Sequence, residues 1–305
     1  MILDQRSAEA RGIRLESSVD DQAALTHSLG QARLAAIHYY PIKSCAGHAL
    51  LSATVEPRGL RYDREFMVVE AASGVMLTQR EQPRMALVTP YCEREHLTLE
   101  APGMKPLTVV PCQSGPAITT TIWKDQVASI DQGNEVAGWF SRYLGFACRL
   151  VRMASVTARP VNRDYALRET DVVSYADGFP FLVASEESLA DLNARLADPV
   201  SMNRFRPNLV LAGCGIPFGE DYLRRFTLGP ITFEAVKPCA RCVITTVEQE
   251  TAGTGREPLR TLAAFRRGSN GALFGQNLIH DRPGTLNVGE QVRVLETRSD
   301  SPVLE

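Results

Sequence analysis

Short apolar runs, many of them rich in β-branched residues, set the pattern of the first half of the chain. Clusters of Gly, Pro, Asn and Asp separate most of these runs, which is typical of an all-β barrel or sandwich rather than of alternating strand–helix units. The first run ends at Pro41, because proline has no N–H to donate to a strand ladder. The predicted strands are 35–40, 53–56, 65–70, 85–92, 96–100, 107–110 and 118–122.

The second half of the chain mixes further strands with helical patterns. Val136, Phe140 and Tyr143 recur at helical spacing, and Gly145 is a suitable residue to end that helix. Ser185 is a suitable N-cap for a second helix, because its hydroxyl accepts a hydrogen bond from a free N–H of the first turn. The predicted helices are 135–144, the segment after Ser185 and 259–267, and the predicted strands are 209–212, 231–236, 243–247 and 291–295.

These patterns predict a mixed, β-rich α+β protein with two domains, in keeping with a length of 305 residues. Residues 157–170 are polar and carry three arginines, so this stretch is the candidate domain boundary. The expected parts are a surface extension (1–32) to which the sequence assigns no function, an N-terminal β-barrel domain (33–155), a second domain (156–298) and a tail (299–305).

Composition narrows the class of protein. The 33 Lys and Arg against 35 Asp and Glu give a net charge of −2, which argues against binding nucleic acid through bulk charge. Seven scattered cysteines do not form a disulfide framework, so we expect the reducing cytoplasm. No apolar run is long enough to span a membrane, and the acidic residues within 1–32 do not suit a secretory signal or a transit peptide.

Two cysteines and two cations share one short turn, residues 237–242 with the sequence KPCARC. The spacing of Cys239 and Cys242 alone is compatible with a redox pair, with part of a zinc site, or with two buried thiols. A redox pair needs a helix that begins at the first cysteine, whereas β-branched residues follow here, and the other cysteines are too scattered for zinc. Neighbouring cations favour the thiolate, which binds soft or high-valent metals. The turn therefore suits one thiolate facing a metal and one guanidinium facing an anion.

Three other turns at the ends of predicted strands carry groups that bind anions. Lys43 and Ser44 follow Pro41, Arg64 precedes the strand at 65–70, and Arg206 and Asn208 flank a proline. Each of these turns by itself is equally an ordinary solvated loop or a surface ion pair. A guanidinium fork combined with an amide suits a phosphate or a hydrogen-bonding heterocycle. Several such turns in one place would bind a phosphorylated cofactor tightly.

The order of these motifs resembles the MOSC-domain family, and most closely the mitochondrial amidoxime reducing component and its bacterial relatives. The matching segments run from Leu34 to Leu295, and they are YPIKSC (40–45), DR (63–64), TQREQPR (78–84), FRPN (205–208), CARC (239–242), EPL (257–259) and FGQN (274–277). The resemblance implies an N-terminal MOSC-type β-barrel domain followed by a β-barrel MOSC domain with a few helices.

The resemblance also implies a molybdenum cofactor, in which a phosphorylated pterin and one protein cysteine hold the metal. Cys242 matches the metal ligand. The positions expected to contact the pterin and its phosphate are Lys43, Ser44, Arg64, Gly178, Phe179, Arg206, Asn208, Ala240 and Arg241. Gly178 and Phe179 stand where mitochondrial members carry hydroxyl side chains, so we expect only backbone contacts there. Asp177 is a candidate proton donor.

The implied function is a molybdenum-cofactor oxidoreductase that reduces N-hydroxylated or N-oxide compounds by two-electron oxygen transfer. We expect no membrane anchor and no built-in iron–sulfur module, and therefore a separate electron-transfer protein of ferredoxin, flavin or haem type. The alternative is a cofactor carrier or sulfur-handling module, because MOSC domains also occur in molybdenum-cofactor sulfurases. Those enzymes use pyridoxal phosphate, but nothing in this sequence resembles their aminotransferase-like domain, so we expect no pyridoxal phosphate here.

Overall fold

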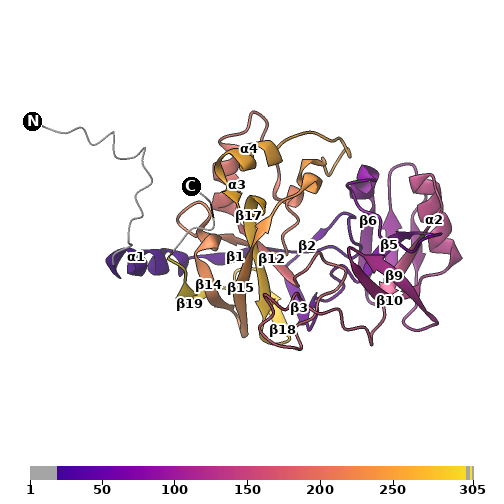
Figure 1. Cartoon of the computed structure of the whole chain (residues 1–305), viewed down its shortest axis with the longest axis horizontal. Coiled ribbons are helices and arrows are strands. Elements are labelled where there is room, and N and C mark those ends of the chain that lie inside the picture. The colour runs from indigo at the N-terminus through magenta and orange to yellow at the C-terminus, as the bar shows by residue number, and fades with distance from the viewer. Residues whose placement is uncertain (1–18, 300–302, 304–305) are drawn as a thin grey trace, which may run out of the picture.

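The computed structural model describes residues 19–299 and 303. Its largest element is a nine-stranded sheet, most of which lies in the left half of the molecule in Figure 1. Along the sheet the order is β19 (Val292–Thr297), β14 (Leu223–Leu228), β15 (Ile231–Ala240), β17 (Gly271–His280), β12 (Phe181–Ser185), β13 (Leu209–Ala212), β1 (Arg33–Tyr39) and β2 (His48–Leu50), and β16 (Arg267–Gly268) pairs with β17.

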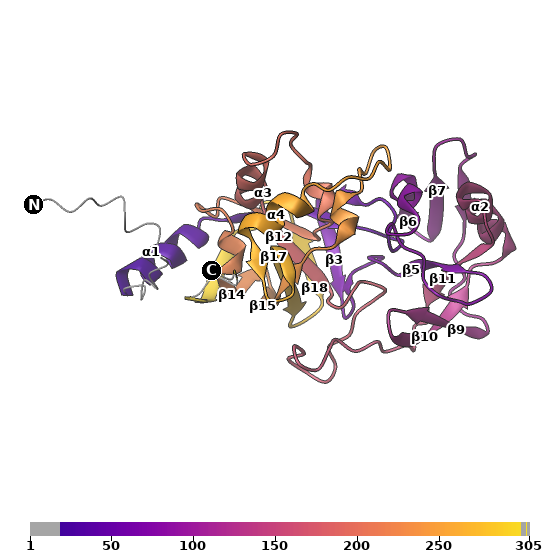
Figure 2. The ribbon, with the colours of Figure 1, turned by 45° about the horizontal axis from the view of Figure 1, so that its top comes forward.

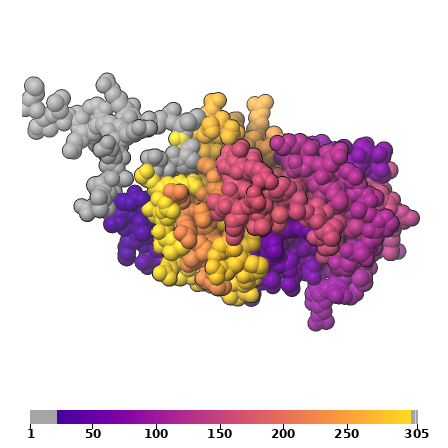
Figure 3. All heavy atoms as spheres, turned by 60° about the horizontal axis from the view of Figure 1, so that its bottom comes forward, coloured from indigo at the N-terminus to yellow at the C-terminus, as the bar shows by residue number. Residues whose placement is uncertain are grey.

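Two of the three smaller antiparallel sheets make up the other half of the molecule, and the third, which contains β18, packs against the large sheet. The four-stranded sheet contains β5 (Phe66–Glu70), β11 (Cys148–Met153), β10 (Asp125–Asp131) and β9 (Ala117–Ile122). One three-stranded sheet contains β6 (Thr89–Glu93), β7 (His96–Glu100) and β8 (Leu107–Val109), and the other contains β18 (Gly284–Asn287), β3 (Ser52–Glu56) and β4 (Gly59–Leu60). The segment between β11 and β12, coloured rose in Figure 3, lies between the two halves.

Helices cover the sheets. The described α-helices are α1 (Val19–Leu29), α2 (Asn134–Leu144), α3 (Glu186–Asn193) and α4 (Leu259–Phe265). Helices α3 and α4 lie on the same side of the large sheet (Figure 2), where Leu192 and Leu262 pack in one cluster with Phe274 of β17. Helix α2 buries Trp139 and Phe140 against the strands of the other half. Each helix therefore buries one apolar face against a sheet, as amphipathic patterning requires.

The predicted helices and most predicted strands are present. Ser185 caps α3 by accepting a hydrogen bond from the Ser188 N–H, and Gly145 ends α2 in the left-handed region at φ 88°. Two predictions were wrong. Residues 83–87 form a 3₁₀ helix that begins at a proline, so only Thr89–Glu93 of the predicted strand 85–92 is a strand. The predicted strand at 243–247 is also a 3₁₀ helix (Val243–Thr246), because the ladder of β15 ends at Ala240 and Cys242 starts a tight turn.

The large sheet includes strands from the start of the chain. Strand β1 pairs antiparallel with β13, with Ile37 opposite Leu209, and also with β2. Strand β3 pairs with β18 in the separate three-stranded sheet, with Ala53 opposite Leu286. The first strands after the extension thus belong to the sheet built mainly from the C-terminal half. The chain then crosses to the smaller sheets after β4 and returns after β11. The predicted domain boundaries stay predictions, and residues 1–18 of the extension and most of the tail lie outside the described residues.

A buried polar network anchors α3 to the large sheet. The Glu220 carboxylate is fully buried and accepts hydrogen bonds from Ser185 Oγ at 2.7 Å and from Ser188 Oγ at 2.7 and 2.8 Å. Its neighbour Asp221 accepts a hydrogen bond from Gln276 Nε2 at 2.6 Å and pairs with Arg266. Burial, and then the negative charge of Asp221, raise the pKa of Glu220 to about 7.

This raised pKa makes stability depend on pH. The folded state binds the Glu220 proton more tightly than the unfolded state, so the stabilisation is present below pH 4.5 and is lost as the pH rises toward 7. In wild type this loss of unfolding free energy amounts to about 3 kcal/mol, and we expect it to be absent in Glu220→Gln. Urea unfolding over this pH range measures the difference. The exposed Glu169→Gln serves as the matched control. Equal slopes of unfolding free energy against pH in wild type and Glu220→Gln would contradict the prediction.

Candidate functional site

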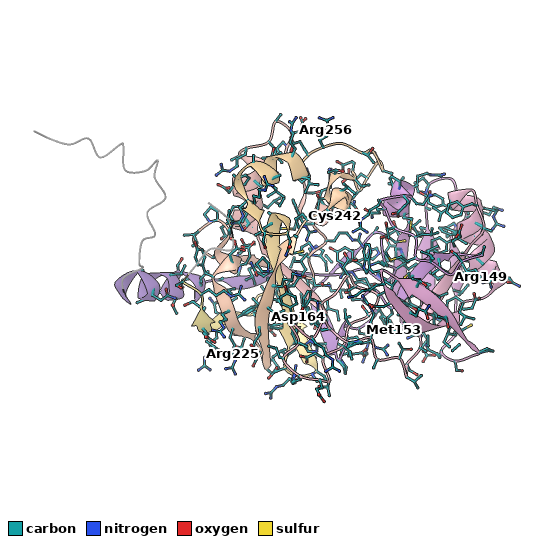
Figure 4. The ribbon with its side chains drawn as sticks, viewed as in Figure 1. Arg149, Met153, Asp164, Arg225, Cys242 and Arg256 are labelled. Carbon is teal, nitrogen blue, oxygen red and sulfur yellow. The ribbon has the colours of Figure 1, made fainter. Side chains whose placement is uncertain are left out.

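A cavity of about 120 Å³ lies where the two halves of the molecule meet, and Cys242 marks its place in Figure 4. Turns from distant parts of the sequence supply its walls. Ten of the eleven predicted site residues line it, namely Lys43, Ser44, Arg64, Asp177, Gly178, Phe179, Arg206, Asn208, Arg241 and Cys242. The eleventh, Ala240, lines a neighbouring cavity. The structure thus brings together turns that are up to about 200 residues apart in the chain.

Three of the turns place non-glycine residues in the left-handed region of backbone space. Ser44 has φ 65°, Arg64 has φ 48° and Arg206 has φ 55°. Such conformations cost roughly 1 kcal/mol or more each and persist only where the surroundings fix them. Here hydrogen bonds fix two of them, since the Arg64 N–H donates to the Tyr40 carbonyl at 2.8 Å and the Arg206 N–H donates to the Asn203 carbonyl at 3.2 Å. Strain concentrated around one cavity indicates a functional site.

The ring of Tyr40 separates two arginines. Its centroid lies 4.2 Å from the guanidinium carbon of Arg64 and 4.3 Å from that of Arg206, and its hydroxyl donates to the Pro207 carbonyl at 3.0 Å. Burial raises the pKa of Tyr40 to about 12, so the phenol stays neutral. Contacts with an aromatic face offset part of the repulsion between two cations. The buried Asp63 offsets more, because its carboxylate pairs with Arg64 at 2.6 Å.

Arg206 carries an unsatisfied donor inside the cavity. Its side chain is almost fully buried, and burial together with repulsion from Arg64 lowers its pKa to about 10. Nη1 donates to the Cys45 carbonyl at 2.6 Å, but Nη2 has no partner among the described residues, and neither has Nε of Arg241. Buried donors without partners are rare and costly, so they point to an anionic ligand that accepts from them.

Asn208 and Ser44 complete this part of the cavity. Asn208 is almost fully buried, accepts a hydrogen bond from Arg64 Nη1 at 3.1 Å and donates to the His38 carbonyl at 3.2 Å. These two hydrogen bonds hold the Asn208 amide in place, and the amide in turn positions the guanidinium of Arg64. The Ser44 carbonyl accepts a hydrogen bond from Gln79 Nε2 at 2.8 Å, and this contact holds Ser44 in the lining of the cavity.

Lys43 and Asp177 form an ion pair at the rim. Lys43 Nζ lies 2.6 Å from Asp177 Oδ1 and donates to the Tyr175 carbonyl at 2.9 Å. Burial lowers the pKa of Lys43. The charge of Lys43 and its hydrogen bond hold the pKa of Asp177 well below its usual range. The Asp177 side chain is 65% exposed, so it is an ionised group in contact with solvent and poorly suited to store a proton.

Both thiols of the C-x-x-C turn line the cavity, and each contacts a guanidinium. Arg241 Nη1 lies 2.8 Å from Cys239 Sγ, while its Nη2 donates to the Phe205 carbonyl at 2.7 Å. Arg80 Nη2 lies 3.2 Å from Cys242 Sγ. The turn therefore offers metal-binding sulfur in a cationic setting.

Two contributors to the site are not apparent from residue types and spacing. Arg80 lies in one of the family-like segments, but nothing in the sequence indicates that it reaches Cys242 from the other half of the molecule. Trp123 packs between cations, with its ring centroid 4.5 Å from the guanidinium carbon of Arg80 and 5.5 Å from Lys43 Nζ. Only the folded chain places these side chains beside the C-x-x-C turn.

The donor set fits a metal that arrives inside an anionic organic cofactor. Among residues 19–299, no group of three or more His, Cys, Asp and Glu side chains is placed to hold a metal ion. One cysteine sulfur, together with single guanidinium nitrogens of Arg206 and Arg241 that lack partners, instead suits a metal that is mostly ligated by its own organic carrier, with the protein adding one sulfur. The fold and the site thus define a β-rich protein with a cationic cofactor pocket between its two halves.

Comparison with known proteins identifies the family. Residues 31–147 match the "MOSC N-terminal beta barrel domain" and residues 170–293 match the "MOSC domain". The chain is 36% identical over 280 residues to "Mitochondrial amidoxime-reducing component 1" of Mus musculus, a match that covers 86% of this chain and 82% of that protein. It is 37% identical over 274 residues to "Mitochondrial amidoxime reducing component 2" of Rattus norvegicus, covering 83% and 80%. The chain therefore belongs to the MOSC-domain family.

A third relative matches this chain over only about a third of the relative's own length. "Molybdenum cofactor sulfurase" of Arabidopsis thaliana is 32% identical over 286 residues, which cover 85% of this chain but 35% of that protein. These matches confirm the family and the β-rich α+β fold with an N-terminal β-barrel domain, and they support the expected molybdenum cofactor. No helix within residues 19–299 has the length and apolar character needed to cross a bilayer.

Substitution of the buried Arg206 should have opposite effects on stability and on anion binding. Replacing it by methionine removes a desolvated cation that Arg64 repels, so we expect Arg206→Met to raise the unfolding free energy of the cofactor-free protein by about 1–2 kcal/mol. The same variant should no longer be stabilised by inorganic phosphate. Thermal unfolding with and without phosphate measures both effects, with the exposed Arg293→Met as control. A destabilised variant that still responds to phosphate would contradict the prediction.

Proposed function

We propose that this protein is a molybdenum-cofactor oxidoreductase that reduces N-hydroxylated or N-oxide compounds, with electrons from a separate protein. The observation that carries the proposal is the pocket that combines the Cys242 thiol with the unpartnered Nη2 of Arg206. The names of the relatives support the substrate class, because two of them are called amidoxime-reducing components.

Each side chain would have a distinct part in holding the cofactor. Cys242 would supply the metal ligand, and Arg80, at 3.2 Å from its sulfur, would orient that thiolate. Arg206 and Arg241 would donate to the pterin and its phosphate with the nitrogen atoms that lack partners. The backbone of Gly178 and Phe179 and the side chains of Lys43, Ser44, Arg64 and Asn208 would close the cavity around the cofactor, and Ala240 would line its edge.

When bound, the molybdenum cofactor would supply two-electron oxygen-transfer chemistry. The chain itself must then deliver protons and exclude competing groups. Asp177 is held ionised by Lys43 and is exposed at the rim, so it would relay protons from solvent rather than act as a protonated acid. Lys43 is buried and paired, which suits it to fixing charge at the rim.

The electron donor would be a separate protein. The word "component" in the relatives' names indicates that they work as one part of a larger system. We retain a ferredoxin-, flavin- or haem-type protein as the proposed donor, and an N-oxygenated small molecule as the substrate. We also retain the cytoplasm as the proposed compartment, which rests on seven cysteines that are all free thiols.

A cofactor carrier or sulfur-handling module is the second candidate. The match to a molybdenum cofactor sulfurase favours it, since the chain spans about a third of that protein's length. A carrier would bind the cofactor through the same pocket but would release it without turning over a substrate. The two functions therefore differ in activity and in cofactor exchange, not in cofactor content.

Metal content tests the assignment of Cys242. In a host that makes the cofactor, we expect wild type to carry molybdenum and pterin in near-equal amounts. The molybdenum content of Cys242→Ser should be lower by about tenfold or more, because a hydroxyl is a poor ligand for a soft metal. Elemental analysis and the fluorescence of released, oxidised pterin give these quantities. Cys239→Ser is the matched control, because its sulfur lines the same cavity.

Turnover separates the two candidate functions. With an artificial reductant, the metal-loaded protein should reduce benzamidoxime to benzamidine and water, and Cys242→Ser should be inactive. A loaded wild-type protein that reduces no amidoxime, hydroxamic acid or N-oxide, yet passes its cofactor to an acceptor protein, would overturn the oxidoreductase in favour of the carrier.

A further inference from the structure

A second and larger cavity opens beside the cofactor pocket. Its volume is about 680 Å³, within the range of about 300–1,000 Å³ that is usual for small-molecule sites. Five of its lining residues also line the cofactor pocket, namely Asp177, Gly178, Phe179, Cys239 and Asn277. A ligand in this second cavity would thus lie against the same turn that carries Cys242.

Aromatic rings form the walls of this cavity. Tyr165 and Phe179 meet edge to face with centroids 5.8 Å apart, and Trp123 faces the same space while 42% exposed. Trp123 is the first of two residues that connect β9 to β10, and its φ of 53° lies in a region that favours glycine. A tryptophan held in such a conformation, at the mouth of a cavity, indicates a binding role for its ring.

The charge of the cavity is unbalanced. Four cations and two carboxylates line it. Arg159 pairs with Asp125 at 2.9 Å, and Asp177 pairs with Lys43. That leaves Lys124, Arg163 and Lys237 without a carboxylate partner among residues 19–299. Lys237 Nζ instead lies 4.4 Å from the centroid of Tyr165, which directs a cation over an aromatic wall.

These groups come from separate elements that the fold brings to one place. Trp123 and Lys124 come from the hairpin of β9 and β10, Lys237 comes from β15, and Arg163 and Tyr165 come from the loop that follows β11. Asp164, which marks that loop in Figure 4, lies in the middle of the molecule between the two sets of strands. No single segment of sequence contains this combination of aromatic and cationic groups.

We infer that this cavity binds the substrate and selects planar, aromatic N-hydroxylated compounds that carry an acidic group. The inference rests on the proposed function and adds the substrate class to it. Trp123 and Tyr165 would stack on the planar body, and Lys237 and Arg163 would pair with the acidic group. These four side chains determine specificity, while the chemistry takes place at the neighbouring cofactor.

The test compares three amidoximes: 4-carboxybenzamidoxime, neutral benzamidoxime and non-aromatic acetamidoxime. We expect wild type to have the lowest KM for the carboxylated compound. Lys237→Gln should raise the KM for that compound by about tenfold, the size of one charge-assisted contact, with kcat unchanged. Its KM for benzamidoxime should change by less than about twofold. Added salt should shrink the preference of wild type, because screening weakens exposed charge pairs.

Two matched variants complete the test. Arg293→Gln removes the same charge from β19, outside the cavity lining, and should leave all three KM values unchanged. Trp123→Phe or Trp123→Ala should raise the KM for both aromatic compounds and leave acetamidoxime unaffected. If Lys237→Gln raises the KM for both aromatic compounds equally, or lowers the molybdenum and pterin content instead, the cavity does not select the acidic group and the inference fails.

Binding measured without turnover separates this inference from the proposed function. The chain has two tryptophans, of which Trp139 is buried and Trp123 faces the cavity. Quenching of Trp123 fluorescence by 4-carboxybenzamidoxime, lost in Trp123→Phe and weakened about tenfold in Lys237→Gln, would support the cavity even if no compound were reduced. Turnover without any such quenching or charge preference would uphold the reductase and overturn the substrate cavity.

Discussion

The repulsion between buried cations at the junction of the two halves is the constraint on which the rest of the site depends. Arg64 and Arg206 flank one tyrosine ring, and burial beside Arg64 lowers the pKa of Arg206 to about 10. A protein without an anion to bind would not retain such an arrangement, because it destabilises the cofactor-free fold. Asp63, Tyr40 and the surrounding carbonyls hold the guanidinium groups in place until that anion is present.

The topology of the sheets explains how this cluster forms. Strands β1 and β2 belong to the large sheet, β4 to a small sheet beside it and β5 to the four-stranded sheet, so the turn around residues 60–65 lies where the chain crosses between the two halves. The turn around residues 40–45 joins β1 to β2 and meets β5 through a bridge between Ile42 and Phe66. Strand β13 pairs with β1 directly after Asn208, which places the Arg206 turn against Tyr40. Of the three left-handed residues, Arg64 lies where the chain changes sheet, whereas Ser44 and Arg206 lie in connections between neighbouring strands of the large sheet.

A gradient of burial runs through the two adjoining cavities. The inner cavity is small, and the buried cations that line it have donors without partners, which suits an anion that stays bound. The outer cavity is larger, and its aromatic and cationic groups are partly exposed. Buried, rigid donors suit a cofactor that stays in place, and exposed, screened charges suit a ligand that exchanges. The C-x-x-C turn lies between the two, with Cys239 lining both cavities and Cys242 lining the inner one.

The sequence by itself determined the β-rich class, most strands, the capped helix after Ser185 and the turns that carry the cofactor-binding residues. Those features depend on local periodicity and on residue types at strand ends. It predicted a strand at 243–247 where a 3₁₀ helix forms, because β-branched composition does not reveal that the ladder of β15 ends at Ala240. It also gave no sign of the contact of Arg80 with Cys242, or of Trp123 and Lys237 sharing one cavity. Only the tertiary structure decided these, since they depend on which distant turns the crossing between sheets brings together.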